Sequence, residues 1–401
     1  MSNESPRPLD GIRVIELGQL LAGPFTGSIL GYFGAEVIKV EPPGNGDPIR
    51  GWRVLDENGT SLWWHSIGRN KKSVTLDLKT ERGRELVREL MKTADVVVEN
   101  FRPGVMEEWG LGPEDLKPFN PGLIFARISG YGQTGPYSAK PGYASVTEGV
   151  SGFRQLNGFP GQPPVRPNLS VGDTISAIHA ALGVCLALLQ RQRDPSAGQV
   201  VDIALYESMF NLMESVVPEY SGAGIIREPS GTTITGIVPT NTYTCADGKY
   251  VVIGGNGDSI FKRLMTAAGH PEMAENSAMA NNAGRVQHQT EIDDALAAWC
   301  ASLPAATVVS TLEAERVPVG LIYNVEDQMN DPHFHARGMF EEVDVDGKPL
   351  TIPAITPVLS DTPGRTDWPG APLGSHNEEV LKGMLKLTDE ELAALAEQGI
   401  C

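Results

Sequence analysis

Basic residues and long apolar runs are scarce in this chain, and each scarcity excludes a class of protein. Its 401 residues include 32 Lys or Arg against 50 Asp or Glu, a formal net charge of −18. An acidic surface repels nucleic-acid phosphates and anionic lipids, so neither partner is expected. No run reaches the roughly eighteen apolar residues of a membrane span, so no membrane association is predicted.

Cysteine and metal-binding patterns are also scarce. The four cysteines contain no C-x-x-C pair, which predicts reduced thiols and a cytoplasmic location. The seven histidines form no H-E-x-x-H pattern, so no metal site is predicted. Residues 1–8 do not have the pattern of a signal peptide.

Alternating strand and helix patterns fill the first half of the chain. This alternation predicts an α/β fold with a doubly wound parallel sheet and right-handed crossovers. The predicted strands are residues 11–17, 36–41, 74–78, 95–99, 123–128 and 198–205, and the predicted helices are 23–33, 80–93, 174–190 and 206–220.

Shifts in composition suggest the domain boundaries. Residues 1–222 form the first part of a large domain, and residues 223–240, rich in Gly, Ser and Thr, form a linker. Residues 241–335 are predicted to be a smaller α/β domain. Residues 336–401 contain a Pro-rich stretch and end in an acidic helix that starts near residue 377.

The glycines of the first strand-to-helix loop do not form a dinucleotide fingerprint. Gly18, Gly23 and Gly27 depart from G-x-G-x-x-G, and bulky residues 20–22 stand where a pyrophosphate needs a close backbone approach. We therefore expect plain turn glycines here and no nicotinamide-dependent dehydrogenase.

A basic run at residues 69–72 precedes a predicted strand, and Lys79, Arg102 and Lys140 lie near other strand ends. In an acidic protein such a set is able to cradle phosphates. A solvated surface run is the alternative interpretation, and the pattern alone does not choose between them.

Asp173 stands where a Pro-rich loop turns into a long apolar helix. A carboxylate there faces the positive end of the helix dipole and stays ionised. It is either a simple N-cap or a nucleophile beside the helix N–H groups, with Gly172 leaving space for a reacting group.

The order of several short segments resembles the family III CoA-transferases, and the resemblance runs nearly end to end. The matching segments are PLDGIRV (8–14), AGP (22–24), GAEVIKVE (34–41), RNKKS (69–73), LDLK (76–79), VENFRPG (98–104), GD (172–173) and APLGSH (371–376).

This resemblance implies a Rossmann-like large domain built from both chain ends, with a smaller α/β domain inserted. It also implies a homodimer of two interlocked rings. The implied chemistry is CoA transfer from an acyl-CoA to a free carboxylic acid, with Asp173 forming an anhydride and then an aspartyl-CoA thioester. CoA is a substrate, and no permanently bound cofactor is implied.

The family's ligand contacts carry over to named positions of this chain. Trp52 matches an aromatic position near the acyl group, and Gly172 lies beside the nucleophile. The positions implied to contact CoA are Leu21, Ala22, Leu76, Lys79, Asn100, Phe101, Arg102, Lys140 and Tyr143.

The segments 215–220, 239–243 and 254–258 resemble members that use succinyl-CoA and short dicarboxylic acids. Gly255 belongs to the last of these segments, and Arg166 or Arg154 is a candidate cation for the second acceptor carboxylate. Leu21 replaces a family Gln and the four-glycine run is missing, which argues against formate and oxalate as substrates.

Two other hypotheses remain at this point. An α-methylacyl-CoA racemase-like enzyme would have a histidine base where this chain has Tyr143. A catalytically silent CoA-binding subunit is the other, and the intact Gly172-Asp173 pair argues against it.

Overall fold

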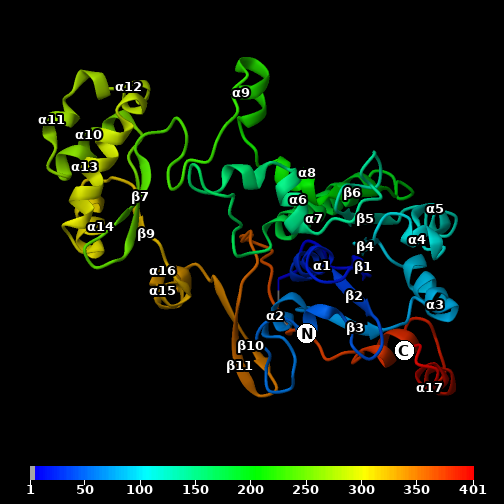
Figure 1. Cartoon of the computed structure of the whole chain (residues 1–401). Helices are drawn as coiled ribbons and strands as arrows, with labels where there is room; N and C mark the ends of the chain where they lie inside the picture. Colours follow the sequence, from blue (N-terminus) through cyan, green and yellow to red (C-terminus); the bar gives the residue numbers. More distant parts are fainter. Residues whose placement is uncertain (1–4) are drawn as a thin grey trace. The chain divides into compact units, whose positions relative to one another are not determined.

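The structure is a computed structural model that describes residues 5–401, and the chain forms two units (Figure 1). Unit 1 comprises the described residues up to Phe153, then Pro167–Glu214 and His335–Cys401. Unit 2 comprises Arg154–Arg166 and Ser215–Phe334. Residues 154–166, which the sequence placed in the first part of the large domain, therefore group with unit 2.

A parallel sheet lies at the centre of unit 1, as predicted. Its six strands follow the order β3-β2-β1-β4-β5-β6. The strand order reverses between β1 and β4, and ligands of such sheets bind at the carboxyl ends of the strands beside this reversal. The strands are β1 (Arg13–Glu16), β2 (Glu36–Glu41), β3 (Lys71–Thr75), β4 (Val96–Glu99), β5 (Ile124–Ser129) and β6 (Val200–Ala204).

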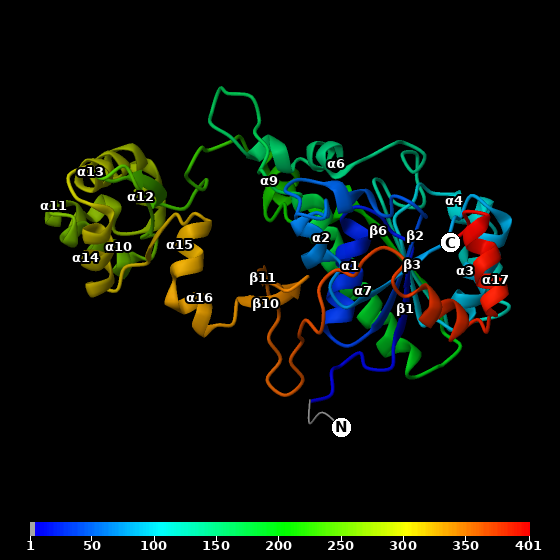
Figure 2. The same cartoon turned by 90° about the horizontal axis from the view of Figure 1, so that it is seen from below.

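Helices cover both faces of the sheet, because successive strand residues point to opposite sides. Ile15 and Val97 pack on the side of α3 (Glu81–Lys92) and α17 (Asp389–Glu397). Val14 and Val98 pack on the side of α1 (Ala22–Tyr32) and α7 (Val171–Arg191). Figure 2 shows the two helix layers with the sheet between them.

Helix α7 has the length and apolar composition of a membrane span. Ala181, Val184 and Leu188 pack it onto the sheet, while Ile178, Leu182 and Leu186 on another face are about half exposed. The helix is thus a layer of the unit 1 core with a second apolar face that the single chain leaves uncovered.

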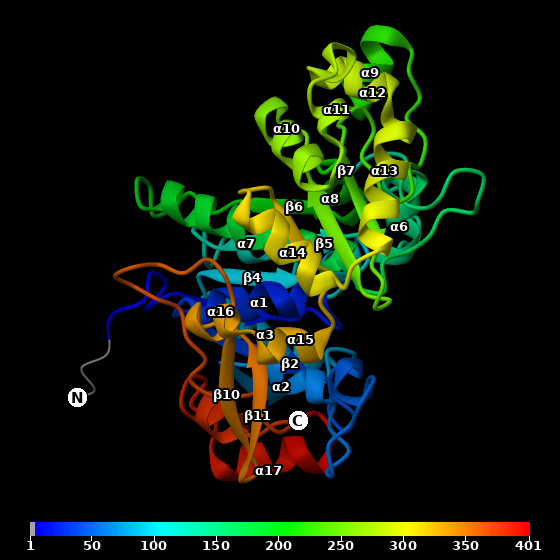
Figure 3. The same ribbon diagram turned by 90° about the vertical axis from the view of Figure 1, so that its left-hand side faces the viewer.

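A β-hairpin near the chain end lies beside α2 (Leu62–Ile67) (Figure 3). Asn58 Nδ2 donates to Asp346 Oδ2 at 2.7 Å, and Lys348 Nζ lies 2.5 Å from Glu57 Oε2. The hairpin is β10 (Phe340–Val345) and β11 (Lys348–Pro353), and the other short elements of unit 1 are η1 (Pro48–Gly51), α4 (Val105–Glu108), α5 (Pro113–Leu116), α6 (Ala144–Val150), α8 (Leu205–Phe210) and the π-helix η4 (Glu378–Lys382).

Unit 2 packs helices on a three-stranded antiparallel sheet of order β7-β8-β9. Its core includes Val251, Ile253, Phe261 and Leu264. The chain passes between the units at four points: within η2 (Phe153–Leu156), after Arg166, after Glu214, and within α16 (Pro332–Ala336). The remaining elements are α9 (Val216–Ala223), β7 (Thr240–Thr244), β8 (Tyr250–Gly254), α10 (Asp258–Ala267), α11 (Pro271–Ala274), η3 (Ser277–Met279), α12 (Asn282–Gln287), α13 (Gln289–Ala301), α14 (Ala305–Ala314), β9 (Val319–Leu321) and α15 (Val325–Asn330).

Three local predictions were wrong. The strand predicted at 74–78 is β3 at Lys71–Thr75, because the buried carboxylate of Glu16 neutralises Lys71 and the partly exposed Glu36 pairs with Lys72, so both lysines belong to the strand. The helix predicted at 206–220 is broken at Glu214, whose left-handed φ of +44° separates α8 from α9. The acidic helix predicted from residue 377 is split into η4 and α17.

Candidate active site

The loop after β1 and the loop after β4 meet where the strand order reverses. The Asn100 side chain joins them: its Oδ1 accepts from the Gln19 N–H and its Nδ2 donates to the Gln19 carbonyl, both at 2.8 Å. Asn100 therefore holds the first loop by its backbone. This is a structural task in addition to the CoA contact implied for it.

The first loop turns into α1 through a residue in a rare conformation. Leu20 has φ +65°, a region that residues other than Gly, Asn and Asp seldom adopt. Its N–H points at Asp47, with 3.0 Å to Oδ1 and 3.2 Å to Oδ2. Leu21 and Ala22 follow at the start of α1, and both are buried.

A buried charge cluster lies beneath this loop. Lys39 Nζ lies 2.9 Å from both Glu16 Oε1 and Asp47 Oδ2, and Lys71 Nζ lies 2.8 Å from Glu16 Oε2. Burial lowers the pKa of Lys71 to about 8. Charges this deeply buried persist because each has a close partner of opposite sign.

The run at residues 69–72 is therefore neither a phosphate cradle nor a solvated surface. Arg69 is buried, and its Nη1 donates to the Pro353 carbonyl at 2.8 Å. Lys71 belongs to the buried cluster, and Lys72 pairs with Glu36 at 2.7 Å. These residues stabilise the fold of unit 1.

Asp173 is the third residue of α7, in its first turn, and it is partly exposed. The N-cap position belongs to Ser170, so the N-cap interpretation of Asp173 was wrong. Because α7 runs back to β6 against the strand direction, its first turn lies at the carboxyl edge of the sheet. The positive end of the helix dipole and the first-turn N–H groups lie beside the Asp173 backbone.

Helix α6 packs directly on this first turn. A Cβ on Gly172 would lie 3.2 Å from the Ala144 Cβ and 3.5 Å from Glu148 Oε1. The side chains of Ala144 and Glu148 therefore fill the α6 side of the space beside Gly172, which the sequence analysis assigned to a reacting group. Gly172 is needed for the close approach of α6 to α7.

Glu148 was missed by the sequence reasoning. Its side chain is fully buried, and its Oε1 accepts from the Gly172 N–H at 3.4 Å. The available signal was a single carboxylate within a stretch of small and apolar residues, five positions after Tyr143. Two carboxylates, those of Glu148 and Asp173, therefore lie at the start of α7. Burying a carboxylate costs free energy, and such groups cluster at functional sites.

Ala22 connects the first loop to the same place. It packs in one apolar cluster with Ala144 and Ala180. Ala22, Ala144 and Gly172 thus bring the starts of α1, α6 and α7 together at the carboxyl edge of the sheet. Tyr143, which precedes α6, is 77% exposed, so its ring is accessible from solvent in this chain.

The other predicted CoA contacts differ in accessibility. Arg102, Lys79 and Lys140 are exposed, and Lys140 Nζ lies 3.4 Å from the centre of the Tyr137 ring. Phe101 is partly buried against Trp109. The Leu76 side chain is 1% exposed and belongs to the core, so only its backbone is placed to meet a ligand.

The predicted acyl-site residues fall in both units. Trp52 lies in unit 1, directly after η1, and is 46% exposed. Arg166 and Gly255 lie in unit 2, where Arg166 is exposed. A Cβ on Gly255 would lie 2.4 Å from Leu264 Cδ2, so this glycine is required by packing within unit 2.

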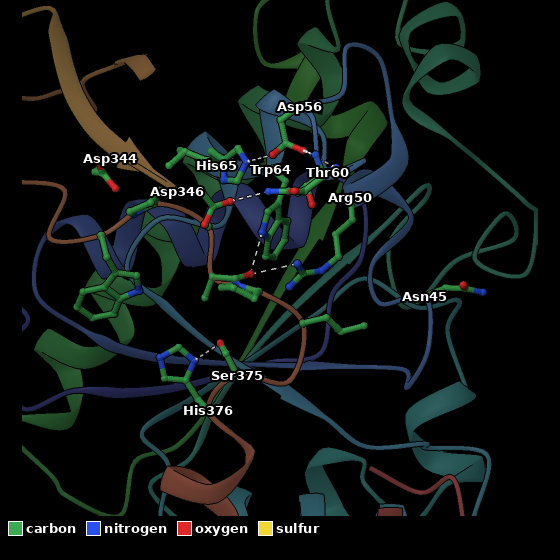
Figure 4. A pocket seen from close by; sticks show the side chains of 18 of the residues that line it. Asn45, Arg50, Asp56, Thr60, Trp64, His65, Asp344, Asp346, Ser375 and His376 are labelled. Carbon is green, nitrogen blue, oxygen red and sulfur yellow. Dashed lines mark hydrogen bonds and ion pairs between the residues drawn. The ribbon is translucent and has the colours of Figure 1, made fainter. Parts of the chain in front are cut away.

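A cavity of about 680 Å³ lies elsewhere in unit 1 (Figure 4). The Arg50 guanidinium stacks 3.7 Å from the Trp64 ring at its wall, and His65 Nε2 lies 2.8 Å from Asp56 Oδ2. The cavity contains none of the predicted site residues. Within residues 5–401, no three His, Cys, Asp or Glu side chains form a group suited to a metal ion.

Comparison with known proteins identifies the family of this chain. The model for CoA-transferase family III matches residues 9–377. The chain belongs to this family. A protein of Chloroflexus aurantiacus named succinyl-CoA--D-citramalate CoA-transferase is 49% identical to this chain, and the match covers 98% of each of the two chains.

Two further relatives of this CoA-transferase are informative. The alpha subunit of succinyl-CoA--L-malate CoA-transferase from Chloroflexus aurantiacus is 40% identical over 98% of this chain and 92% of its own length. A CAIB/BAIF family protein from Brucella suis has a similar solved structure, with a TM-score of 0.82, 34% identity, and coverage of 95% of this chain and 100% of that one. The α/β fold and the CoA-transferase assignment predicted from the sequence are thereby confirmed.

Proposed function

We propose that this transferase moves CoA from succinyl-CoA to a C4 or C5 dicarboxylic acid, with Asp173 as the covalent nucleophile. The observation that carries the proposal is the position of Asp173 in the first turn of α7, at the sheet edge where the loops after β1 and β4 meet. The names of the two Chloroflexus relatives, which pair succinyl-CoA with citramalate or malate, support the substrate class.

The proposed first half-reaction forms an aspartyl thioester. An Asp173 carboxylate oxygen attacks the thioester carbonyl, the C–S bond breaks, and CoA leaves as a thiolate with a mixed anhydride behind it. The thiolate then attacks the Asp173 carbonyl of this anhydride and releases succinate. First-turn N–H groups of α7 stabilise the oxyanion that develops at each attack.

The second half-reaction is the reverse with another acid. The acceptor carboxylate attacks the aspartyl thioester and expels the thiolate, which next attacks the acceptor side of the new anhydride. Acceptor-CoA forms and the Asp173 carboxylate is regenerated. One thioester and one carboxylate are exchanged for another pair, so the cycle needs no ATP.

A dicarboxylic acceptor has a second carboxylate that needs a cation. Arg166 and Arg154 in unit 2 are our candidates for this role. A guanidinium suits it because it binds a carboxylate through two parallel hydrogen bonds.

We also propose that the chain works as an interlocked homodimer in the cytoplasm. The uncovered apolar face of α7 supports an association, because Ile178, Leu182, Leu186 and Leu189 are 47–58% exposed along one helix. Contiguous exposed apolar residues mark an interaction surface. The word subunit in the name of the malate relative makes a hetero-oligomer the competing arrangement.

The test is CoA exchange from succinyl-CoA to formate, oxalate, malate, citramalate, itaconate, mesaconate and glutarate, measured by mass spectrometry. We expect transfer to a C4 or C5 dicarboxylate and none by Asp173→Ala. Transfer only to formate or oxalate would overturn the proposed substrate class. Unchanged transfer by Asp173→Ala would overturn the proposed nucleophile.

A further inference from the structure

Leu20 is held in its left-handed conformation by one buried carboxylate. The Asp47 side chain is fully buried, and both of its oxygens lie within hydrogen-bonding distance of the Leu20 nitrogen. A leucine does not keep φ +65° without compensation, and the surrounding structure must impose it. Asp47 supplies this compensation because a carboxylate accepts a backbone N–H strongly.

The same carboxylate also fixes a second segment. Asp47 is the N-cap of η1, where its Oδ1 accepts from the Ile49 N–H at 3.0 Å. Helix η1 ends at Gly51, and Trp52 follows as its C-cap, with its N–H bonded to the Ile49 carbonyl at 3.2 Å. The backbone position of Trp52 therefore depends on the turn that Asp47 starts.

Asp47 is itself held rigidly. Its Oδ2 lies 2.9 Å from Lys39 Nζ, and its own N–H donates to Glu41 Oε2 at 3.0 Å. Lys39 also donates to the Gly18 carbonyl at 2.9 Å, so its ammonium group also holds the backbone of the loop after β1. A binding site keeps a precise geometry only if the residues behind it are held rigidly, as Asp47 is.

We propose that Asp47 is a positioning residue that sets the acyl-group selectivity of the transferase. It joins the Leu20 turn, which places Leu21 and Ala22, to the η1 turn, which places Trp52. This inference rests on the proposed function and on two positions implied by the family resemblance: Trp52 near the acyl group and Leu21 in contact with CoA. Asp47 does not touch the substrate.

The test compares kcat/KM for succinyl-CoA and acetyl-CoA in the wild type, Asp47→Ala, Asp47→Ala/Leu20→Gly and Glu16→Gln. We expect Asp47→Ala to reduce the succinyl-to-acetyl preference at least fivefold. Glycine adopts positive φ without a side-chain penalty, so the double variant should recover part of that preference. Glu16→Gln, which removes a carboxylate from Lys39 but none from the loop, should keep the preference within twofold.

Each outcome has a separate meaning. A preference unchanged in Asp47→Ala, or lost equally in Glu16→Gln, overturns the positioning role of Asp47. Loss in Asp47→Ala with no recovery in the double variant overturns the part played by Leu20. A wild type that uses neither acyl-CoA contradicts the proposed donor, and the same ratio is then measured with the two best acyl-CoA donors of a wider panel.

A second measurement needs no variant to fold. Hydrogen exchange of the wild-type protein, read at single-residue resolution by fragmentation, should show the Leu20 amide protected at least a hundredfold relative to an unstructured chain. Rapid exchange at Leu20 in the folded protein would overturn the tether to Asp47, whatever the activity of the variants.

Discussion

Glu148 Oε1 lies 3.4 Å from the backbone nitrogen of Gly172, the residue that precedes the proposed nucleophile Asp173. The carboxylate is fully buried between α6 and the first turn of α7. It satisfies a helix N–H group that has no partner within α7. The first turn that carries Asp173 is therefore anchored from a neighbouring helix.

Two substitutions of Glu148 distinguish the effect of its hydrogen bond to Gly172 from the effect of its negative charge. Glu148→Ala leaves the Gly172 N–H buried without its acceptor, which should lower the free energy of unfolding by about 1–3 kcal/mol and kcat at least tenfold. Glu148→Gln keeps an acceptor oxygen and should recover much of the stability. Urea unfolding and initial rates measure both, and wild-type stability of Glu148→Ala would contradict the anchoring role.

Gly172→Ala tests the close approach of α6 and α7. The new methyl group would lie 3.2 Å from the Ala144 Cβ, tighter than ordinary van der Waals contact, and should destabilise the protein by about 1–3 kcal/mol. The matched control is Gly149→Ala on α6, where a Cβ meets nothing within 4 Å and should stabilise by up to about 1 kcal/mol. Thermal unfolding distinguishes them, and equal effects would argue against a specific contact at Gly172.

Lys71 should make the stability of the protein depend on pH in the alkaline range. Burial lowers its folded-state pKa to about 8, from an ordinary value of 10.5. Between these two values the unfolded chain holds a proton that the folded chain has lost. The free energy of unfolding therefore rises with pH, by at most about 1.4 kcal/mol per pH unit.

Lys71→Met isolates this contribution. Unfolding in urea at pH 7, 8, 9 and 10 should show the wild type gaining stability relative to Lys71→Met as pH rises above about 8. Other groups titrate in both proteins and cancel in the difference. A constant difference across this range would show that Lys71 does not change its charge in the folded protein.

Asn100 should act through the loop that it holds. Asn100→Ala removes both side-chain bonds to Gln19, and we expect KM for acyl-CoA to rise roughly tenfold, which corresponds to about 1.4 kcal/mol. Asn120→Ala is a control, because Asn120 Nδ2 also donates to two backbone carbonyls, those of Met91 at the end of α3 and Ala94, but at the opposite end of β4. A KM that is unchanged in Asn100→Ala would show that the two loops keep their positions without this side chain.

The uncovered apolar face of α7 predicts that the protein is an oligomer. A charged residue introduced on this face should hinder its assembly. Leu182→Glu places a carboxylate at the centre of this face. Interlocked subunits cannot separate while they stay folded, so we expect this variant to form less dimer after unfolding and refolding, measured by sedimentation velocity. Gln190→Glu, also exposed on α7, adds the same charge away from the centre and should leave the dimer intact. A monomeric wild type would contradict the proposed dimer directly.

The parallel sheet could be predicted because its strands are short apolar runs separated by helices of clear periodicity. The strand predicted at 36–41 is β2 residue for residue. The predicted strand was shifted relative to β3 because two consecutive lysines, Lys71 and Lys72, are typical of an exposed surface segment. Their partners Glu16 and Glu36 lie on other strands, and such long-range pairing leaves no local signal in the sequence.

The candidate site was only partly predictable for the same reason. Gly172 and Asp173 form a recognisable motif, and Asn100 follows a buried strand. Asp47 and Glu148 act by reaching backbone groups of distant segments, and a single carboxylate in the sequence does not show this. Leu76 was assigned to CoA by its motif, although the structure buries its side chain in the core.

The most direct test of the central claim is to look for the covalent bond to Asp173. The wild-type protein is mixed with succinyl-CoA without an acceptor acid, quenched in acid and measured by intact mass spectrometry with peptide mapping. We predict a CoA adduct on the peptide that contains Asp173, which free acceptor acid removes and Asp173→Asn lacks. CoA transfer that proceeds with no adduct under any quenching condition, together with an active Asp173→Asn protein, would contradict the account.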